Sequence, residues 1–450
     1  MEKERKCTCG PYPTIDITSI YYKNKEIQHD PSFDTKTMEE LLTACQSYGC
    51  FHLTIQTPPD NDNDKLAVFR SYQKENATKE DILELFQADF LEQCFNLDSQ
   101  SETTEYNEEI DLNGMYILPY SNNCHSSEKI FSEVTFRGRN AESGDPKSAA
   151  ASGAVKLSHI LNQKLHLSTG AEPKQSWEWK RYSSNINSIN TAKYTKPSPK
   201  CISKLEILQS WTNAFHSIST TLSNILKLPP SFLEHSTSPQ KSNRDLLRVF
   251  RYDPLPSDKI CNQHLGSSPH TDWGTMTIVW QDSMGGLQTY CHLHQCWNIV
   301  PPPPKLNEIN GDEKDVLHFF VHVGDFTSLA TFSKWPSPRH RVLCPNASQS
   351  NPDRIPSPRC SLVYFAYPKL GYSLADAQRE FLKQYGQNQC NDYCIPFTHY
   401  SLLQNQSLEK SMIDVGYGNN LCIHESTYQQ ILSRGFDLVI SDKWSQVQRG

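Results

Sequence analysis

A histidine and an aspartate two residues apart precede an apolar segment in the second half of the chain. His270 and Asp272 stand in "PHTDWG", directly before "TMTIVW". Residues i and i+2 of a strand point to the same face, so the two side chains would lie side by side. A neutral imidazole beside a carboxylate offers two ligands to a divalent metal. The same pair could also be a polar cap at the end of a strand, and a third ligand would decide between the two interpretations.

Five histidines follow this pair within the strand-rich region, and His340 is the strongest candidate for the third ligand. It begins the short segment "HRVLCP", far enough along the chain for several antiparallel strands to return beside the first. Two histidines and one carboxylate that leave open coordination positions suit a non-haem Fe(II) that activates oxygen. The other four histidines are His292, His294, His318 and His322.

An arginine and a serine two residues apart occur in the apolar segment "RCSLVYFAYP". Arg359 and Ser361 would share one face of this strand with Val363 and Phe365. A buried guanidinium is costly unless an anion meets it. A guanidinium next to a hydroxyl suits a buried carboxylate, which a ligand or the protein itself could provide.

The elements that must position these residues change character along the chain. From about residue 245, short segments rich in Val, Ile, Phe and Tyr alternate with Gly and Pro turns, which predicts an all-β sandwich or jelly roll. Apolar residues spaced by three or four predict one long helix over 204–227, ended by Pro229 and Pro230. Near the start, "PTIDIT" predicts a strand and "TMEELLTACQSYGCFHLT" a helix that stops at Gly49 before a second strand. Polar loops or insertions are predicted at 97–112, 183–200, 307–315 and 346–358.

The bulk composition limits the classes of partner. The 450-residue chain has a net charge of −7 and a pI of about 6.1, with no basic stripe, so we expect no nucleic-acid partner. The segment "MEKERKCTCG" contains no apolar stretch, and no run of 18 apolar residues occurs, so we expect neither a secretory signal nor a membrane span. Fifteen cysteines without a regular framework indicate mostly reduced thiols and a cytoplasmic protein, in which the sequons at Asn76, Asn346 and Asn405 would be unused.

The order of these motifs resembles a known enzyme family. The segments "PHTDWGTMTIVWQDSMGGLQ", "VHVGDF", "SPRHRV" and "PRCSLVYF" resemble the iron(II)/2-oxoglutarate-dependent dioxygenases of the isopenicillin N synthase-like group over about residues 245–370. "PTIDIT" and "ACQSYGCFHL" resemble the N-terminal region of the same group over a shorter stretch. The chain departs from the usual pattern at Trp273, at His322, where asparagine is common, and in the proline-heavy "ATFSKWPSPRHRV".

The resemblance implies a fold, a site and an activity. The fold would be mainly β with flanking helices (α+β), around a double-stranded β-helix, or jelly-roll, core. His270, Asp272 and His340 match the iron ligands, Arg359 and Ser361 match the pair that binds the distal carboxylate of 2-oxoglutarate, and Tyr252 matches a tyrosine that contacts this co-substrate. The cofactors would be Fe(II), 2-oxoglutarate and O2, with ascorbate as a candidate addition. The reaction would oxidise a C–H bond of a small molecule, by hydroxylation, desaturation or ring closure, in a monomeric enzyme.

Three alternatives stay open. The dense "YCHLHQCW", with Cys291, His292, His294 and Cys296, could bind zinc. The chain could be an iron oxidase of the same fold that does not use 2-oxoglutarate. It could also be a non-catalytic binding member of the family, although such a protein would have no need to bury all of these polar residues.

The chain organisation that we predict has four parts. Residues 1–200 would resemble the N-terminal region of the dioxygenases, and 201–244 would form a support helix and linker. Residues 245–370 would form the jelly-roll domain, and 371–450 a helical extension.

Overall fold

The computed structural model describes the central part of the chain in segments. Several positions named above lie outside the described residues: the loops at 97–112, 183–198, 307–315 and 346–356, Asn76, Asn346, Asn405, Trp273, His292 and the chain after 385. The described residues are 12–22, 31–57, 65–70, 77–95, 115–122, 130–137, 174–182, 199–233, 245–254, 265–272, 274–291, 294, 296–303, 316–331, 334–345, 357–368 and 374–385.

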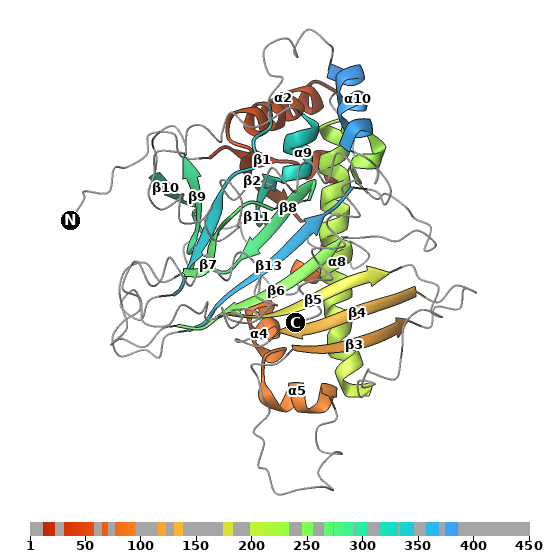
Figure 1. Cartoon of the computed structure of the whole chain (residues 1–450), viewed down its shortest axis with the longest axis vertical. Helices are drawn as coiled ribbons and strands as arrows, with labels where there is room; N and C mark the ends of the chain where they lie inside the picture. The colour runs from red at the N-terminus through yellow and green to blue at the C-terminus, as the bar shows by residue number, and fades with distance from the viewer. Residues whose placement is uncertain are drawn as a thin grey trace, which may run out of the picture.

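Eight strands in the second half of the chain form two facing sheets (Figure 1). Successive strands change sheet except at the β9–β10 hairpin: β6, β13, β8 and β11 are neighbours in the large sheet, and β7, β12, β9 and β10 in the small one. This order is a double-stranded β-helix and confirms the predicted fold class. The strands are β6 (Leu246–Tyr252), β7 (Leu265–His270), β8 (Met276–Gln281), β9 (Leu287–Cys291), β10 (Cys296–Ile299), β11 (Val316–Val323), β12 (His340–Leu343) and β13 (Arg359–Ala366).

Strands from the first half of the chain extend the large sheet at both edges. Its full order is β1-β2-β11-β8-β13-β6-β5-β4-β3. At the edge next to β11 lie β1 and β2, which are the two N-terminal strands predicted from the sequence. The other edge, β3 to β5, was not predicted, because these strands lie between insertions and repeat no strong apolar alternation. The added strands are β1 (Thr14–Asp16), β2 (Cys50–Gln56), β3 (Met115–Asn122), β4 (Ile130–Arg137) and β5 (Lys174–Tyr182).

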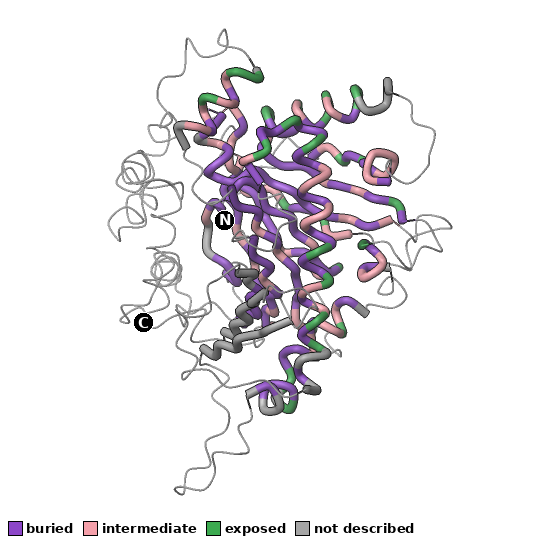
Figure 2. The backbone as a smooth tube through the Cα atoms, turned by 90° about the vertical axis from the view of Figure 1, so that its right-hand side faces the viewer, coloured by how far each residue is buried: buried purple, intermediate pink, exposed green. Residues whose placement is uncertain are grey.

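Helices cover the outer face of the large sheet. The longest, α8 (Pro199–Ile225), begins five residues before the predicted start and runs along the sheet, its inner side buried and its outer side exposed (Figure 2). Its predicted apolar stripe is buried: Leu208, Trp211, Phe215, Ile218 and Leu222 have no exposed surface. The other helices are α1 (Thr18–Tyr22), α2 (Pro31–Ser47), α3 (Ala67–Arg70), α4 (Ala77–Glu84), α5 (Ala88–Phe95), α9 (Asp325–Ala330), α10 (Leu374–Tyr385) and the 3-10 turn η5 (Pro230–Phe232).

Alternation along each strand separates an outer core from an inner one. In β13, Cys360, Leu362 and Tyr364 face the helices, while Arg359 and Ser361 face the space between the two sheets. That inner space is packed with a second apolar cluster. Its members include Phe250, Tyr252, Val279, Leu287, Val300, Phe320 and Val342.

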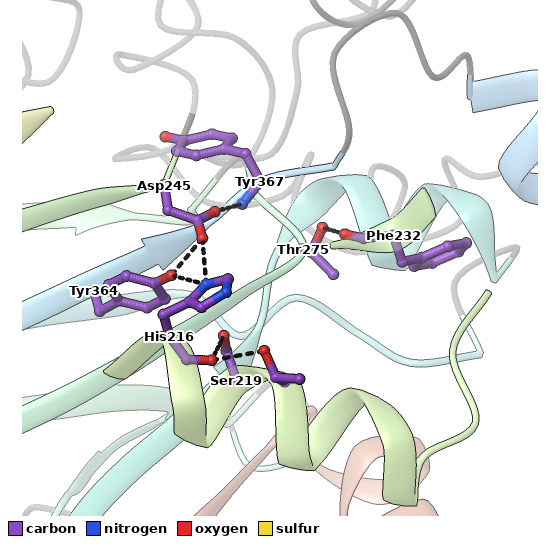
Figure 3. A network of polar contacts seen from close by, with 8 residues as sticks. His216, Ser219, Phe232, Asp245, Thr275, Tyr364 and Tyr367 are labelled. Carbon is purple, nitrogen blue, oxygen red and sulfur yellow. Dashed lines mark hydrogen bonds and ion pairs between the residues drawn. The ribbon is translucent and has the colours of Figure 1, made fainter. Parts of the chain in front are cut away.

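A buried polar network fastens α8 to the sheet (Figure 3). The Asp245 carboxylate, just before β6, lies 3.1 Å from His216 Nδ1 on α8 and accepts a hydrogen bond from the Tyr364 hydroxyl of β13. Its other oxygen accepts the backbone N–H of Tyr367 at 3.1 Å. The close-up also shows the Thr275 hydroxyl donating to the carbonyl oxygen of Phe232 at 2.6 Å, which anchors the loop that follows Asp272.

One pair of cysteines departs from the reduced state that the sequence indicated. Cys94 of α5 and Cys201 of α8 form a disulfide across 107 residues of sequence, and both are fully buried. The other six cysteines in the described segments carry free thiols, as predicted: Cys45, Cys50, Cys291, Cys296, Cys344 and Cys360. Among the described helices, none is long and apolar enough to cross a membrane.

Candidate metal and co-substrate site

Two histidines of the small sheet and an aspartate of the following loop meet at one end of the jelly roll. His270 ends β7 and His340 begins β12, and these two residues are direct partners in the sheet. Asp272 lies two residues beyond β7. One ligand atom from each of the three lies within 4.8 Å of the others. The structure thus brings together three residues that the sequence singled out from distant segments.

The distances fit a shared cation. His270 Nε2 is 3.5 Å and His340 Nε2 is 3.8 Å from Asp272 Oδ1. Two ligands at about 2.1 Å from one metal, at right angles, lie about 3 Å apart, so small side-chain movements suffice to coordinate an ion. The carboxylate and His340 are buried and His270 is partly exposed, which leaves an approach from one side.

Electrostatics favour an ionised carboxylate at this position. Burial alone would raise the pKa of Asp272, but His340, His322 and His270 oppose it, together with a hydrogen bond from the Thr277 hydroxyl at 2.7 Å. The net effect is a lowered pKa. A carboxylate that stays charged inside the protein is the form that binds a metal.

Close backbone approaches hold the Asp272 loop against the end of β11. A Cβ added to Gly324 would lie 2.1 Å from the Gly274 carbonyl oxygen, so only glycine fits there. The backbone N–H of Asp325 donates to the carbonyl oxygen of Asp272 at 2.7 Å, and the Thr271 hydroxyl donates to the Asp325 side chain at 2.9 Å. Thr271, Asp272 and Gly274 therefore pack directly against Gly324 and Asp325 at the end of β11.

Deeper between the sheets lies a buried arginine with neutral partners. Arg359 Nε donates to the carbonyl oxygen of Gly285, Nη1 lies 3.2 Å from Ser361 Oγ, and Nη2 lies 3.2 Å from Gln281 Oε1. Arg359 is 1% exposed, and no carboxylate of the described segments is within ion-pair distance of it. The protein partner considered above is therefore absent from this part of the chain. One N–H on each terminal nitrogen is left for an anion, and such a fork suits a carboxylate.

Tyr252 packs against the guanidinium of Arg359. It is the direct partner of Arg359 in the sheet, and the Arg359 guanidinium carbon lies 4.8 Å from the centre of the Tyr252 ring. The arrangement is a cation–π contact, which orients the guanidinium. Its placement agrees with the residue set inferred from the resemblance, although its role in binding a co-substrate stays a prediction.

The zinc alternative receives no support from the described residues. Cys291 and Cys296 are sheet partners, and Cys291 Sγ is 3.5 Å from His294 Nδ1. Within the described segments, however, only His270, Asp272 and His340 form a cluster of three ligand atoms close enough to share an ion.

One further histidine belongs to the neighbourhood of the site and was not assigned to it from the sequence. His322 of β11 is 1% exposed, and its Nε2 lies 3.4 Å from Asp272 Oδ2. Burial, with His340 nearby, lowers the pKa of His322 to about 3, so the ring is neutral. The sequence named His322 as one of five candidate histidines and as a departure from the asparagine that is common at this position. Alternation along "VHVGD" places it on the inner face of the strand.

Comparison with known proteins agrees with this geometry. Residues 243–368 match the family described as the 2OG-Fe(II) oxygenase superfamily. A 2-oxoglutarate-dependent dioxygenase from Didymella fabae is 31% identical over 129 residues, which are 28% of this chain and 33% of that protein. A gibberellin 2-beta-dioxygenase from Phaseolus coccineus is 29% identical over 137 residues, 30% of this chain and 35% of that protein. The matched part spans about a third of the length of these relatives.

The comparison with solved structures found matches at low sequence identity. A full-length Neurospora crassa protein, solved in complex with alpha-KG, is 17% identical, with a TM-score of 0.45 over 82% of this chain and 89% of that one. A dioxygenase for auxin oxidation from Arabidopsis thaliana, in a 2-oxoglutarate complex, is 14% identical, with a TM-score of 0.40 over 80% and 94% of the two chains.

Proposed function

We propose that this chain, whose residues 243–368 are a domain of the 2OG-Fe(II) oxygenase superfamily, couples the oxidation of 2-oxoglutarate to oxidation of a C–H bond in a small molecule. The observation that carries the proposal is the convergence of His270, Asp272 and His340 at one end of the jelly roll, together with the buried Arg359 that has no charged partner among the described residues.

The three clustered side chains would hold Fe(II). Two neutral imidazoles and one carboxylate are the ligand set that suits this ion, and three protein ligands leave other positions open. The chemistry that Fe(II) supplies in this superfamily, when bound, is the activation of dioxygen, with 2-oxoglutarate converted to succinate and carbon dioxide. The protein positions the reactants and keeps bulk water from them.

Arg359 and Ser361 would bind the distal carboxylate of 2-oxoglutarate. The free N–H groups of Arg359 would donate to its two oxygens, and the Ser361 hydroxyl would add a third hydrogen bond. Gly285 and Gln281 keep the guanidinium plane fixed, and Tyr252 covers it. The free donors of Arg359 suit a carboxylate ligand. They therefore favour an enzyme that uses 2-oxoglutarate over an oxidase that does not, and over a protein without catalytic activity.

Within the superfamily, we place the chain in the isopenicillin N synthase-like group. The N-terminal segments that resemble this group form β1, α2 and β2, and β2 extends the large sheet next to β11. The substrate would be a small molecule, as the name of the gibberellin enzyme states for that relative. The cytoplasmic location, the monomeric state and the division at residues 200, 244 and 370 stay predictions.

Anaerobic titration with Fe(II) and 2-oxoglutarate, followed by a screen of metabolites for stimulated succinate formation, tests the proposal. Asp272→Ala should lose iron and turnover, because it removes the only charged ligand. Native consumption of 2-oxoglutarate by purified Asp272→Ala would show that the site is wrongly assigned. Metabolite oxidation without succinate would identify the 2-oxoglutarate-independent oxidase instead.

A further inference from the structure

His322 lies beside the metal ligands without belonging to their cluster. Its ring centre is 4.6 Å from that of His340, yet it is not among the three residues whose ligand atoms lie within 4.8 Å of one another. Its Nε2 is fully buried and makes no hydrogen bond to any described residue, although it lies 3.4 Å from Asp272 Oδ2. A buried ring nitrogen in this position calls for a partner.

The two oxygens of Asp272 face different groups. Oδ1 faces the ring nitrogens of His270 and His340 at 3.5 and 3.8 Å. Oδ2 accepts the Thr277 hydroxyl at 2.7 Å and faces His322. The carboxylate thus has a metal side and a protein side, and His322 is on the protein side.

The two ring nitrogens of His322 lie near different acceptors. A neutral imidazole carries one N–H, on either nitrogen, and an imidazolium carries one on each. Its Nδ1 is 3.5 Å from the carbonyl oxygen of Val323, which is longer than the about 2.7–3.2 Å of an ordinary N–H···O hydrogen bond. A carboxylate is a stronger acceptor than a carbonyl, so the proton belongs on Nε2.

We propose that His322 is a positioning residue that donates its Nε2–H to Asp272 Oδ2 and, with Thr277, restricts the carboxylate to binding the metal through Oδ1 alone. This inference rests on the proposed function, because it requires a metal at His270, Asp272 and His340. Hydrogen bonds to a metal ligand from residues that do not bind the metal themselves orient that ligand and raise the metal affinity of the site. Asparagine, whose amide N–H also donates, could replace the histidine in this role.

The test measures Co(II) affinity of the full chain by anaerobic titration, without turnover. His322→Phe keeps a ring but removes the donor, and should raise the Co(II) Kd by about 10- to 100-fold. His322→Asn should bind Co(II) nearly as well as the native protein. His318→Phe is the matched control, since it makes the same change four residues earlier on the same strand, and its affinity should be native.

The visible spectrum of bound Co(II) provides a second readout. His322→Phe should change it, because Asp272 would be free to bind through both oxygens, whereas His322→Asn should retain the native spectrum. His322→Leu repeats the test if the phenylalanine variant fails to fold.

Two results would overturn the inference. One is native affinity and spectrum in the variants that lack a donor. The other is an equal loss in His322→Asn and His322→Phe, which would mean that the imidazole acts otherwise than as a donor. The proposed function fails separately, if His340→Ala binds Co(II) as tightly as the native chain.

Discussion

At the scale of single residues, a buried cation without a charged partner is the most informative feature of the molecule. Arg359 donates to one carbonyl, one hydroxyl and one amide oxygen, and none of these neutral acceptors balances its charge. A buried guanidinium in such a setting is costly until an anion arrives. The buried guanidinium would therefore lower the stability of the free protein, and it would bind anions selectively.

Removing this guanidinium should weaken 2-oxoglutarate binding. A charge-assisted contact contributes about 1.5–3 kcal/mol, so Arg359→Ala should raise the apparent KM for 2-oxoglutarate by about 10- to 100-fold. Arg251→Gln, on the neighbouring strand and paired with Asp253, is the control and should keep the native KM. An unchanged requirement in Arg359→Ala would mean that the carboxylate binds elsewhere.

A partly buried histidine outside the cluster of His270, Asp272 and His340 should make stability depend on pH. Burial, with the charge of His318 facing it from β11, lowers the pKa of His52 to about 4 from an ordinary 6.5. As the pH falls below 6.5, the unfolded chain binds a proton that the folded chain refuses, so stability is lost between about pH 6.5 and 4. Above pH 6.5 this contribution is fully present.

Replacing His52 should flatten this dependence. His52→Gln should lose less stability than the native protein between pH 7 and 5, by about 1–2 kcal/mol after allowance for the partial exposure of the ring. Urea unfolding at both pH values measures the difference. Equal losses in the two proteins would show that His52 ionises alike in the folded and unfolded chains.

At the scale of elements, the turn between β8 and β9 contacts both the N-terminal helix α4 and Arg359. Lys79 of α4 contacts the buried Asp282 carboxylate at 2.8 Å. The same carboxylate accepts the backbone N–H groups of Cys360 and Met284 at 2.9 and 3.1 Å. This turn also supplies the Gly285 carbonyl that holds Arg359. The position of the guanidinium thus depends on a contact with a helix far away in the sequence.

Breaking that contact should destabilise the fold more than breaking a similar pair at the surface. Lys79→Met leaves a buried carboxylate with only its backbone donors, and should lower the free energy of unfolding by about 1–3 kcal/mol. Lys204→Met removes a Lys–Glu pair whose side chains are 48% and 46% exposed, and should cost at most about 1 kcal/mol. Urea denaturation compares the two, and equal effects would rule out a special role for the turn.

At the scale of the whole molecule, the proposed ligands would join the two sheets. His270 and His340 belong to the small sheet, whereas Arg359 and Ser361 belong to the large one. A metal and a co-substrate bound between them would therefore add links that the unfolded chain lacks. Ligands that bind only the folded state stabilise it by mass action.

Loading should raise the thermal stability in a defined pattern. Co(II) and 2-oxoglutarate together, each at about 100 times its Kd, should add more than the about 2.7 kcal/mol expected of one ligand. 2-Oxoglutarate alone should add little. Thermal unfolding of the native protein and of Asp272→Ala measures this, and the variant should show no joint effect. The same shift in both proteins would mean that binding does not involve the cluster.

The sequence by itself determined the residues that could do chemistry and the face on which each would lie. Arg359 and Ser361 share a face of β13 because alternation is a local property of the extended backbone. The same rule did not apply to His270 and Asp272, because β7 ends at His270 and Asp272 lies in the loop that follows. The stripe of α8 and the strand after Gly49 were equally local, and the structure has both. The short segments rich in Val, Ile, Phe and Tyr, and the order of the motifs along the chain, predicted the jelly roll.

Tertiary structure alone decided which distant groups meet. The separation of Arg359 from any described carboxylate, the approach of His322 to Asp272 and the anchoring of Asp282 by Lys79 depend on strand register and helix packing. The disulfide between Cys94 and Cys201 and the strands β3 to β5 also escaped prediction, because they depend on pairings between segments separated by long insertions. Local sequence fixes the direction of a side chain, but the neighbour it meets is selected by the packing of the entire chain.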